Sequence, residues 1–159
     1  MSIPTRLTRY LDARGTRYEL HVHEPSQTSA ETARHAHVMP HQLAKSVILE
    51  DDDGCVMAVV PADRVVKIGR LGELLGRQDL HLADEDRVAT LFEDCARGAV
   101  PPVGMAWGVE TIVDEDLEEV DTVYLEAGDH LHLLRLSQKH FHTLMADARH
   151  EAIGKKPVH

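Results

Sequence analysis

The first residue that could do chemistry is a lysine in an apolar stretch. Lys45 lies between Ala44 and Ser46, just before Val47-Ile48-Leu49. A buried ammonium group is costly unless it is paired or used. Lys45 is therefore a candidate functional residue. The alternative is that it lies at a strand end and extends its ammonium group into solvent.

A glycine- and proline-rich segment is the second candidate. Residues 98–108 read Gly-Ala-Val-Pro-Pro-Val-Gly-Met-Ala-Trp-Gly. This composition excludes a helix interior or a central strand and predicts a loop of fixed shape. Its backbone N–H groups could hold a carbonyl or phosphate oxygen. Equally, the segment could be a structural crossover packed by Val103 and Trp107.

Histidine is frequent, with 12 copies. His21 with His23, and His130 with His132, form i,i+2 pairs that would each lie on one face of a strand. A zinc site is the chemistry that such pairs suggest, but the chain has no H-E-x-x-H or C-x-x-C pattern. We therefore expect no metal site and no cofactor. We interpret the histidines as surface or pocket residues.

Other reaction classes find little support. The chain has no G-x-S-x-G pattern, and neither Cys55 nor Cys95 has a catalytic context. The net charge is −10, which argues against nonspecific coating of nucleic acid. Aromatic residues make up 4% of the chain, too few for a base-stacking platform. A polyanionic ligand could still be held at a small, locally basic site.

Length and hydropathy predict one soluble domain. A chain of 159 residues can bury a core without disulfides or a structural metal. No apolar run approaches the ~18 residues that a membrane span requires, and the N-terminus lacks the apolar core of a signal peptide. We expect a cytoplasmic protein with no membrane partner. We also expect a monomer, because no conspicuous apolar patch stands out.

The elements that would position these residues are short helices and strands. The predicted helices cover residues 3–14, 29–37 (with Thr28 and Glu31 as a capping box), 71–75, 84–92 and a segment capped by Ser137. The predicted strands cover residues 18–22 (ended by Pro25), 46–49, 55–60, 111–113, 122–125 and 131–136. The runs 46–49 and 55–60 are continuously apolar, which indicates a hairpin covered on both faces.

We therefore expect an α/β (α+β-like) fold, a single domain over residues 1–159 with a mixed central β-sheet flanked by short helices. Its core would run from about residue 10 to 148. The tail, residues 154–159, is expected to be frayed.

Four segments together resemble the YbaK/prolyl-tRNA synthetase-associated domain family. They are Thr-Ser-Ala-Glu-Thr-Ala at 28–33, Ala-Lys-Ser-Val-Ile-Leu at 44–49, Val-Val-Pro-Ala-Asp-Arg at 59–64 and Gly-Ala-Val-Pro-Pro-Val-Gly at 98–104. The resemblance covers about residues 10–148. Members of this family are free-standing relatives of the editing insertion domain of bacterial prolyl-tRNA synthetase.

The resemblance implies hydrolysis in trans of the ester that joins a wrong amino acid to the 3′ end of a tRNA. Lys45 falls on the family's near-invariant lysine, which would orient the terminal adenosine and its phosphate or the substrate carbonyl. Gly98 and Pro102 fall on the family's G-x-x-x-P loop, whose amides would place the ester carbonyl. A water molecule would attack, and neither a metal nor a cofactor is implied.

The resemblance also suggests contacts around these residues. Substrate-binding residues would be Thr28, Ser46, Ala99, Val100, Pro101 and His130, with His23 as the alternative histidine. A patch for the tRNA acceptor stem could consist of Arg64, Lys67 and Arg70, with Arg77 beside them; the alternative is a solvated surface.

The partner would be an aminoacyl-tRNA, with an aminoacyl-tRNA synthetase as a possible second partner. A small pocket suits Ala, Ser, Thr or Cys as the amino acid removed. The competing hypothesis is a non-catalytic module that binds a tRNA end or a nucleotide, with or without a synthetase. A third hypothesis is a metal-dependent hydrolase that uses the histidines.

Overall fold

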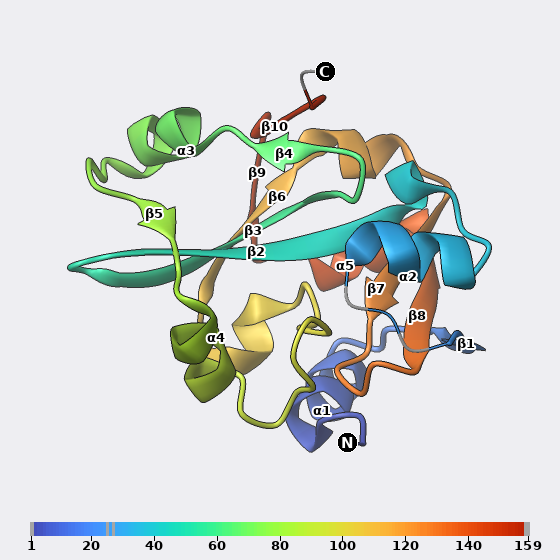
Figure 1. The fold of residues 1–159 in the computed structure, drawn as a ribbon. Coiled ribbons are helices and arrows are strands. Elements are labelled where there is room, and N and C mark those ends of the chain that lie inside the picture. The colour runs from blue at the N-terminus through green and yellow to red at the C-terminus, as the bar shows by residue number, and fades with distance from the viewer. Residues whose placement is uncertain (1, 25, 27, 158–159) are drawn as a thin grey trace.

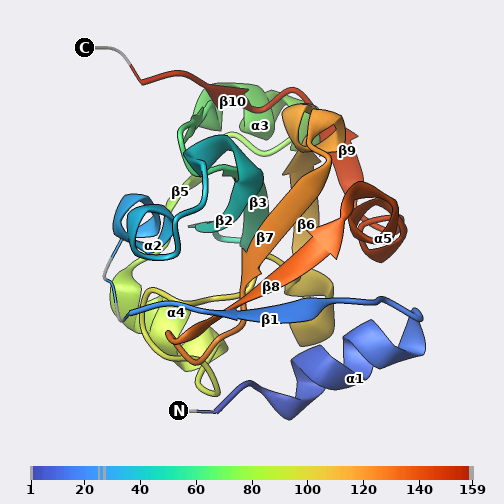
Figure 2. The ribbon, with the colours of Figure 1, turned by 90° about the vertical axis from the view of Figure 1, so that its right-hand side faces the viewer.

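A mixed β-sheet forms the centre of the molecule, and helices cover both of its faces (Figures 1 and 2). The computed structural model describes residues 2–24, 26 and 28–157, so the strand end predicted at Pro25 and the last residues of the tail lie outside the described residues. The strands of this sheet in spatial order are β1 (Glu19–Val22), β8 (His132–Ser137), β7 (Thr122–Glu126), β2 (Leu43–Asp51), β3 (Gly54–Pro61), β6 (Glu110–Asp114) and β9 (Arg149–Glu151). A further short strand, β5 (His81–Leu82), pairs with the far end of β2.

The helices divide between the two faces of the sheet. Figure 1 shows α3 (Ile68–Leu75) on one side of the β2–β3 hairpin, with α1 (Thr5–Ala13) and α4 (Glu85–Leu91) on the other. Figure 2 shows α2 (Ser29–His35) and α5 (Gln138–Leu144) on opposite sides of β7 and β8. Three short 3₁₀ helices complete the described chain: η1 (Pro40–Gln42), η2 (Gly104–Trp107) and η3 (Glu115–Glu119).

The β2–β3 hairpin is central, as the continuous apolar runs predict. Residues 56–60 of β3 are fully buried. Along β2, side chains alternate between the two faces. Ala44 and Ile48 pack into the core cluster that α1 and α5 also enter, whereas Leu49 packs with α3 on the opposite face. The predicted mixed sheet flanked by short helices is therefore confirmed.

The C-terminal tail is more ordered than the sequence predicts. Gly154–Lys155 form strand β10, which pairs with β4 (Val65–Val66), so the prediction of fraying from Gly154 is wrong for these two residues. The cause is the carboxylate of Asp114. It is buried and accepts hydrogen bonds from the N–H groups of Ile153 and Gly154 at 2.9 and 3.0 Å.

The glycine- and proline-rich segment is a loop that contains one short helical turn, η2. Gly104 is required there, because a Cβ atom would lie 2.4 Å from the Thr111 hydroxyl. Trp107 donates a hydrogen bond to Asp94 at 2.9 Å and packs against Phe92. The second half of the segment is thus a packed crossover, whereas its first half faces a cleft. No helix in the described part of the chain is long and apolar enough to cross a membrane.

Candidate active site

A cleft of about 750 Å³ opens along β2, where this strand changes partners. β2 pairs with β7 in parallel only at Leu43 and Ala44, and with β5 only at Leu49 and Glu50. Between these ladders, residues 45–47 pair only with β3 among the described residues. Residues 45–48 form one wall of the cleft. The gap in the sheet therefore creates the cleft.

Lys45 lies at the start of this gap. Its side chain is half-buried, and within the described part of the chain no hydrogen bond or ion pair reaches its ammonium group. Burial lowers the pKa of Lys45, and the nearby charge of Asp63 opposes that shift. The side chain lines the cleft, so its ammonium group can meet a ligand there; extension into solvent stays the alternative.

The loop at residues 96–100 forms the facing wall and is fixed to the sheet. Ser46 donates a hydrogen bond from Oγ to the carbonyl of Val100 at 2.9 Å. The N–H of Ala96 donates to the carbonyl of Gly128 at 2.7 Å, and the N–H of Ala99 donates back to Ala96. The N–H groups of Gly98 and Val100 have no acceptor among the described residues. The N–H of Arg97, in the same loop, also has no acceptor among the described residues, so the amides of Arg97, Gly98 and Val100 are available to a bound carbonyl oxygen.

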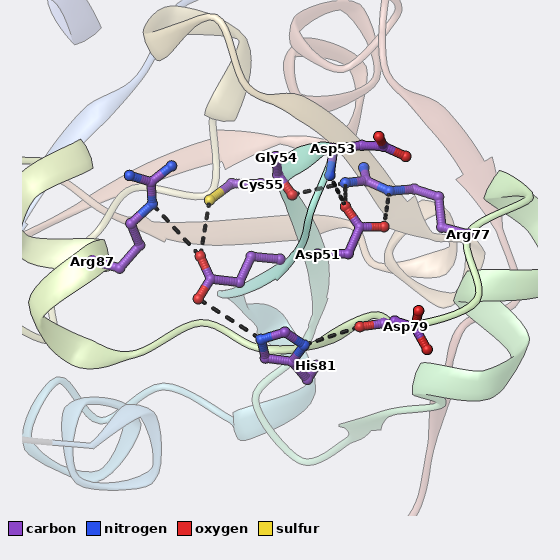
Figure 3. A network of polar contacts seen from close by, with 9 residues as sticks. Asp51, Asp53, Gly54, Cys55, Arg77, Asp79, His81 and Arg87 are labelled. Atoms are coloured by element: carbon purple, nitrogen blue, oxygen red, sulfur yellow. Dashed lines mark hydrogen bonds and ion pairs between the residues drawn. The ribbon is translucent and has the colours of Figure 1, made fainter.

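The third wall is β5 with α4, which contribute Leu82, Ala83, Glu85 and Val88. The segment before β5 contains Arg77, and contacts of this arginine hold the segment at the β2–β3 turn (Figure 3). Arg77 donates from Nε to Asp51 at 2.7 Å and from Nη2 to the carbonyl of Gly54 at 2.7 Å. These hydrogen bonds lower the pKa of Asp51 to about 2.

Glu50 connects β2 to both parts of the third wall. One of its carboxylate oxygens lies 3.6 Å from Nε of Arg87 on α4, and the other lies 3.9 Å from Nε2 of His81 on β5 (Figure 3). These charged contacts add to the backbone pairing of β5 with β2 and to the packing of Val88 against the core.

A buried carboxyl group, Glu126, lies at the end of β7 and lines the cleft. Burial raises the pKa of Glu126 to about 7, while a hydrogen bond from Thr32 opposes the shift. Nε2 of His23, whose side chain is fully buried, lies 4.0 Å from Oε2 of Glu126. Burial lowers the pKa of His23.

His130 lines the cleft from the turn that follows β7. Its backbone is left-handed, with φ of 68°, and the carboxylate of Asp129 holds the turn. Oδ1 of Asp129 accepts hydrogen bonds from the N–H groups of Leu131 and His132, both at 3.0 Å. Burial acts to raise the pKa of Asp129, but these bonds and the one from the His132 ring leave it below its usual value.

The structure brings five of the predicted site residues together in the cleft: Lys45, Ser46, Gly98, Val100 and His130. The other predicted substrate contacts do not line it. Ala99, Pro101 and Pro102 are buried at the base of the loop. Thr28 is the N-cap of α2 and accepts a hydrogen bond from the N–H of Glu31, whereas the next residue, Ser29, lines the cleft.

The residues predicted to contact the acceptor stem lie outside the cleft and near acidic partners. Arg64 lies 2.9 Å from Asp63, and Arg70 lies 3.9 Å from Glu73. Lys67 occupies the N-cap position of α3. Arg77 is held by Asp51, so it is a structural residue of the hairpin turn. A role of Arg64, Lys67 and Arg70 in binding tRNA stays a prediction.

Among the described residues, the cleft has neither a thiolate at Cys95 nor a cluster of metal ligands. Cys95 lines the cleft, but burial raises the pKa of its thiol to about 12, so it is not a thiolate nucleophile. Among the residues that the structure describes, no three His, Cys, Asp or Glu side chains gather in a way that could hold a metal ion.

Comparison with known proteins decides the family. A model described as "Aminoacyl-tRNA editing domain" matches residues 23–144, which is most of the chain. The chain belongs to the aminoacyl-tRNA editing domain family. The match includes Lys45, the 98–102 loop, Glu126 and His130.

Relatives of this editing domain include two proline–tRNA ligases. That of Lactobacillus helveticus is 26% identical over 102 residues, and that of Lactobacillus acidophilus is 26% identical over 88 residues. These matches cover 64% and 55% of the editing domain but 18% and 15% of the ligases. The chain therefore spans less than a fifth of the length of these relatives.

Two solved structures share the fold of the editing domain over nearly their whole length. One, named "putative trans-editing enzyme for prolyl tRNA synthetase", is 25% identical with a TM-score of 0.79, covering 97% of this chain and 99% of that one. The other, hypothetical protein APE2540, is 26% identical with a TM-score of 0.82, covering 94% and 99%.

Proposed function

We propose that this editing domain is a deacylase that acts in trans on tRNA carrying a wrong small amino acid of the Ala, Ser, Thr or Cys class. The observation that carries the proposal is the cleft at the gap beside β2. It combines the unpaired ammonium group of Lys45 with the free N–H groups of Gly98 and Val100, in a chain of the editing-domain family.

This set of groups suits an ester that is already activated. The ammonium group of Lys45 orients the 3′ end of the tRNA through a phosphate or the ester carbonyl. The N–H groups of Gly98 and Val100 stabilise the negative charge that develops on that carbonyl oxygen as water attacks. Positioning and charge stabilisation are sufficient for such a reaction.

The size and lining of the cleft favour a small amino acid attached to the terminal adenosine. Its volume of about 750 Å³ is within the range of small-molecule sites, roughly 300–1,000 Å³. Val47, Val88 and Phe92 supply an apolar part of the lining. Editing is needed because a difference of one methylene is worth only about 1–3 kcal/mol in a synthetase pocket.

The names of two relatives and one solved structure support tRNA for proline as the first candidate. Cooperation with a synthetase is part of this proposal. Action as a monomer and location in the cytoplasm stay predictions.

The test is a deacylation panel with tRNA charged with Ala, Ser, Thr, Cys or Pro. We expect release of one or two small amino acids, and a loss of at least about a hundredfold in Lys45→Ala. Lys139→Ala is the control, because Lys139 is an exposed lysine on α5 that does not line the cleft. Circular dichroism checks that the variants fold.

Two results would overturn the proposal. A folded protein that releases nothing from the panel is the non-catalytic binding module instead. Hydrolysis that survives unchanged in Lys45→Ala places the reaction elsewhere on the molecule. The same assay after exhaustive chelation tests whether a metal is needed. We expect full deacylation activity, and a loss of activity would favour the metal-dependent hydrolase.

A further inference from the structure

Buried polar atoms without hydrogen-bond partners gather beside the cleft. Among the described residues they include Nε2 of His23, Oε2 of Glu126 and Nδ1 of His130. The first two atoms are 4.0 Å apart. His130 and Asp129 lie close enough to His23 for their charges to act on its pKa. Glu126 and His130 line the cleft, whereas His23 does not line it and contacts the cluster from within the protein.

The unpartnered Nε2 of His23 is an acceptor, and Oε2 of Glu126 is an acceptor when the carboxyl group is ionised. Nδ1 of His23 lies 2.7 Å from the carbonyl of Glu24, so Nδ1 carries the proton and Nε2 of the neutral ring presents a lone pair. Thr32 hydrogen-bonds the Glu126 carboxyl, and Oε2 remains without a partner among the described residues. At 4.0 Å the two acceptors are too far apart to bond each other directly.

Such a pair requires a donor, because a buried polar group without a hydrogen bond is destabilising. A primary ammonium group fits best. Its three N–H groups can reach more than one acceptor, and its charge compensates the carboxylate. Both side chains are enclosed by the protein: that of His23 is fully buried and that of Glu126 is 9% exposed.

We propose that Glu126, with His23 beside it, binds the α-ammonium group of the aminoacyl ester, so that the editing domain accepts esters with a free α-amino group and rejects N-acylated ones. This inference rests on the deacylase function proposed above. In this arrangement Lys45 contacts the phosphate or carbonyl of the substrate, and Glu126 contacts its amine.

The protonation of both partners supports this pairing. Burial raises the pKa of Glu126 to about 7, close to the ordinary α-amino value of about 7.7–8.0. The carboxyl group can therefore be neutral in the empty cleft and ionised when an ammonium group is bound. N-Acylation removes the charge and two of the N–H bonds and leaves the buried acceptors unpaired. Sites built to bond an N–H group reject analogues that lack it.

The test compares each aminoacyl-tRNA that the protein hydrolyses with its N-acetylated form, after subtraction of the uncatalysed rates. We expect acetylation to lower kcat/KM at least roughly a hundredfold in the wild type. Glu126→Gln is expected to lower kcat/KM roughly tenfold to a hundredfold for the free-amine ester and to leave the acetylated ester unchanged. The ratio between the two esters therefore shrinks.

The control is Glu93→Gln, since Glu93 is an exposed glutamate that does not line this cleft. We expect it to leave both rates unchanged. Equal hydrolysis of free and acetylated esters by the wild type would overturn the inference while the deacylase function stands. An unchanged ratio in folded Glu126→Gln would also overturn it. Failure to hydrolyse any ester would overturn the proposed function, and the inference with it. If Glu126→Gln does not fold, the wild-type ratio alone decides.

Discussion

The buried carboxyl group of Glu126 makes the stability of the fold depend on pH in a specific direction. Its pKa is about 7 in the folded protein, against an ordinary value of 4.5. Below pH 4.5 the group is protonated in both the folded and the unfolded state and costs nothing. As the pH rises from 4.5 to 7, the unfolded chain releases this proton and the folded chain keeps it. The free energy of unfolding therefore falls over this range and levels off above it.

The magnitude follows from the size of the shift. At about 1.4 kcal/mol per pKa unit, Glu126 destabilises the fold by about 3 kcal/mol above pH 7. Glu126→Gln replaces the carboxyl group with an uncharged group of similar shape, so this cost disappears. We expect the free energy of unfolding of the variant, relative to the wild type, to rise by about 2–3 kcal/mol between pH 5 and pH 8.

Urea unfolding of both proteins at pH 5 and pH 8 measures this difference directly. His23 contributes with the opposite sign, because burial lowers its pKa and its stabilising effect is lost as the pH falls through the unfolded value. Both proteins contain His23, so only the part of its titration that depends on the charge of Glu126, 4.0 Å away, enters the comparison. Glu93→Gln should follow the wild type at both pH values. If Glu126→Gln also follows the wild type, Glu126 is ionised in the folded protein and the reasoning is refuted.

Two further predictions concern glycines with left-handed backbones. Gly98→Val should lower the free energy of unfolding by about 1–3 kcal/mol, since φ is 78°, and should reduce the rate of deacylation at least tenfold. Gly15→Val, at φ of 63° and outside the cleft, should lower stability alone. Equal activity of the two variants in the deacylation assay would show that the loop is not part of the site. Gly128→Ala should lower the free energy of unfolding, measured with urea, by about 1–3 kcal/mol. The reason is that φ is 95° and the new Cβ would lie 2.7 Å from Cδ of Pro4. Gly69→Ala, where a Cβ meets nothing within 4 Å, should show no loss, and a similar loss in both would contradict the steric argument.

The sequence predicts the longer elements well, because their signals are local. Thr28 is the N-cap of α2, and the apolar runs at 46–49 and 55–60 pair as the central hairpin. The short strands β4, β5, β9 and β10 escape prediction because two or three residues carry no periodicity. Their existence depends on tertiary pairing, such as that of β5 with Leu49 and Glu50.

The candidate site is only partly predictable for the same reason. Lys45 and Gly98 stand out in the sequence, but their meeting across a cleft depends on where β2 leaves β7 and joins β5. Glu126 was missed, although it ends an apolar strand much as Lys45 begins one. Its neighbourhood is rich in acidic residues, and the sequence does not show which of these carboxyl groups the fold buries: Asp114, Glu126 and Asp129 are buried, whereas most of their acidic neighbours are not. Arg77 was expected at a solvated or RNA-binding surface, whereas a carboxylate of the Asp-Asp-Asp turn binds it.

The attachment of the third cleft wall has a consequence for how such a domain changes over evolutionary time. β5 and the chain after it reach β2 through two residue pairs, the N–H of Ala83 donating to the carbonyl of Ile48, and the charged contacts of Glu50. Leu82 and Glu85 of this wall are exposed and line the cleft, whereas Val88 packs against the core. Substitutions at the exposed positions can therefore change the shape of the cleft without disturbing the core. On the function proposed above, preference for one amino acid over another is free to drift among descendants while the sheet and Lys45 are inherited.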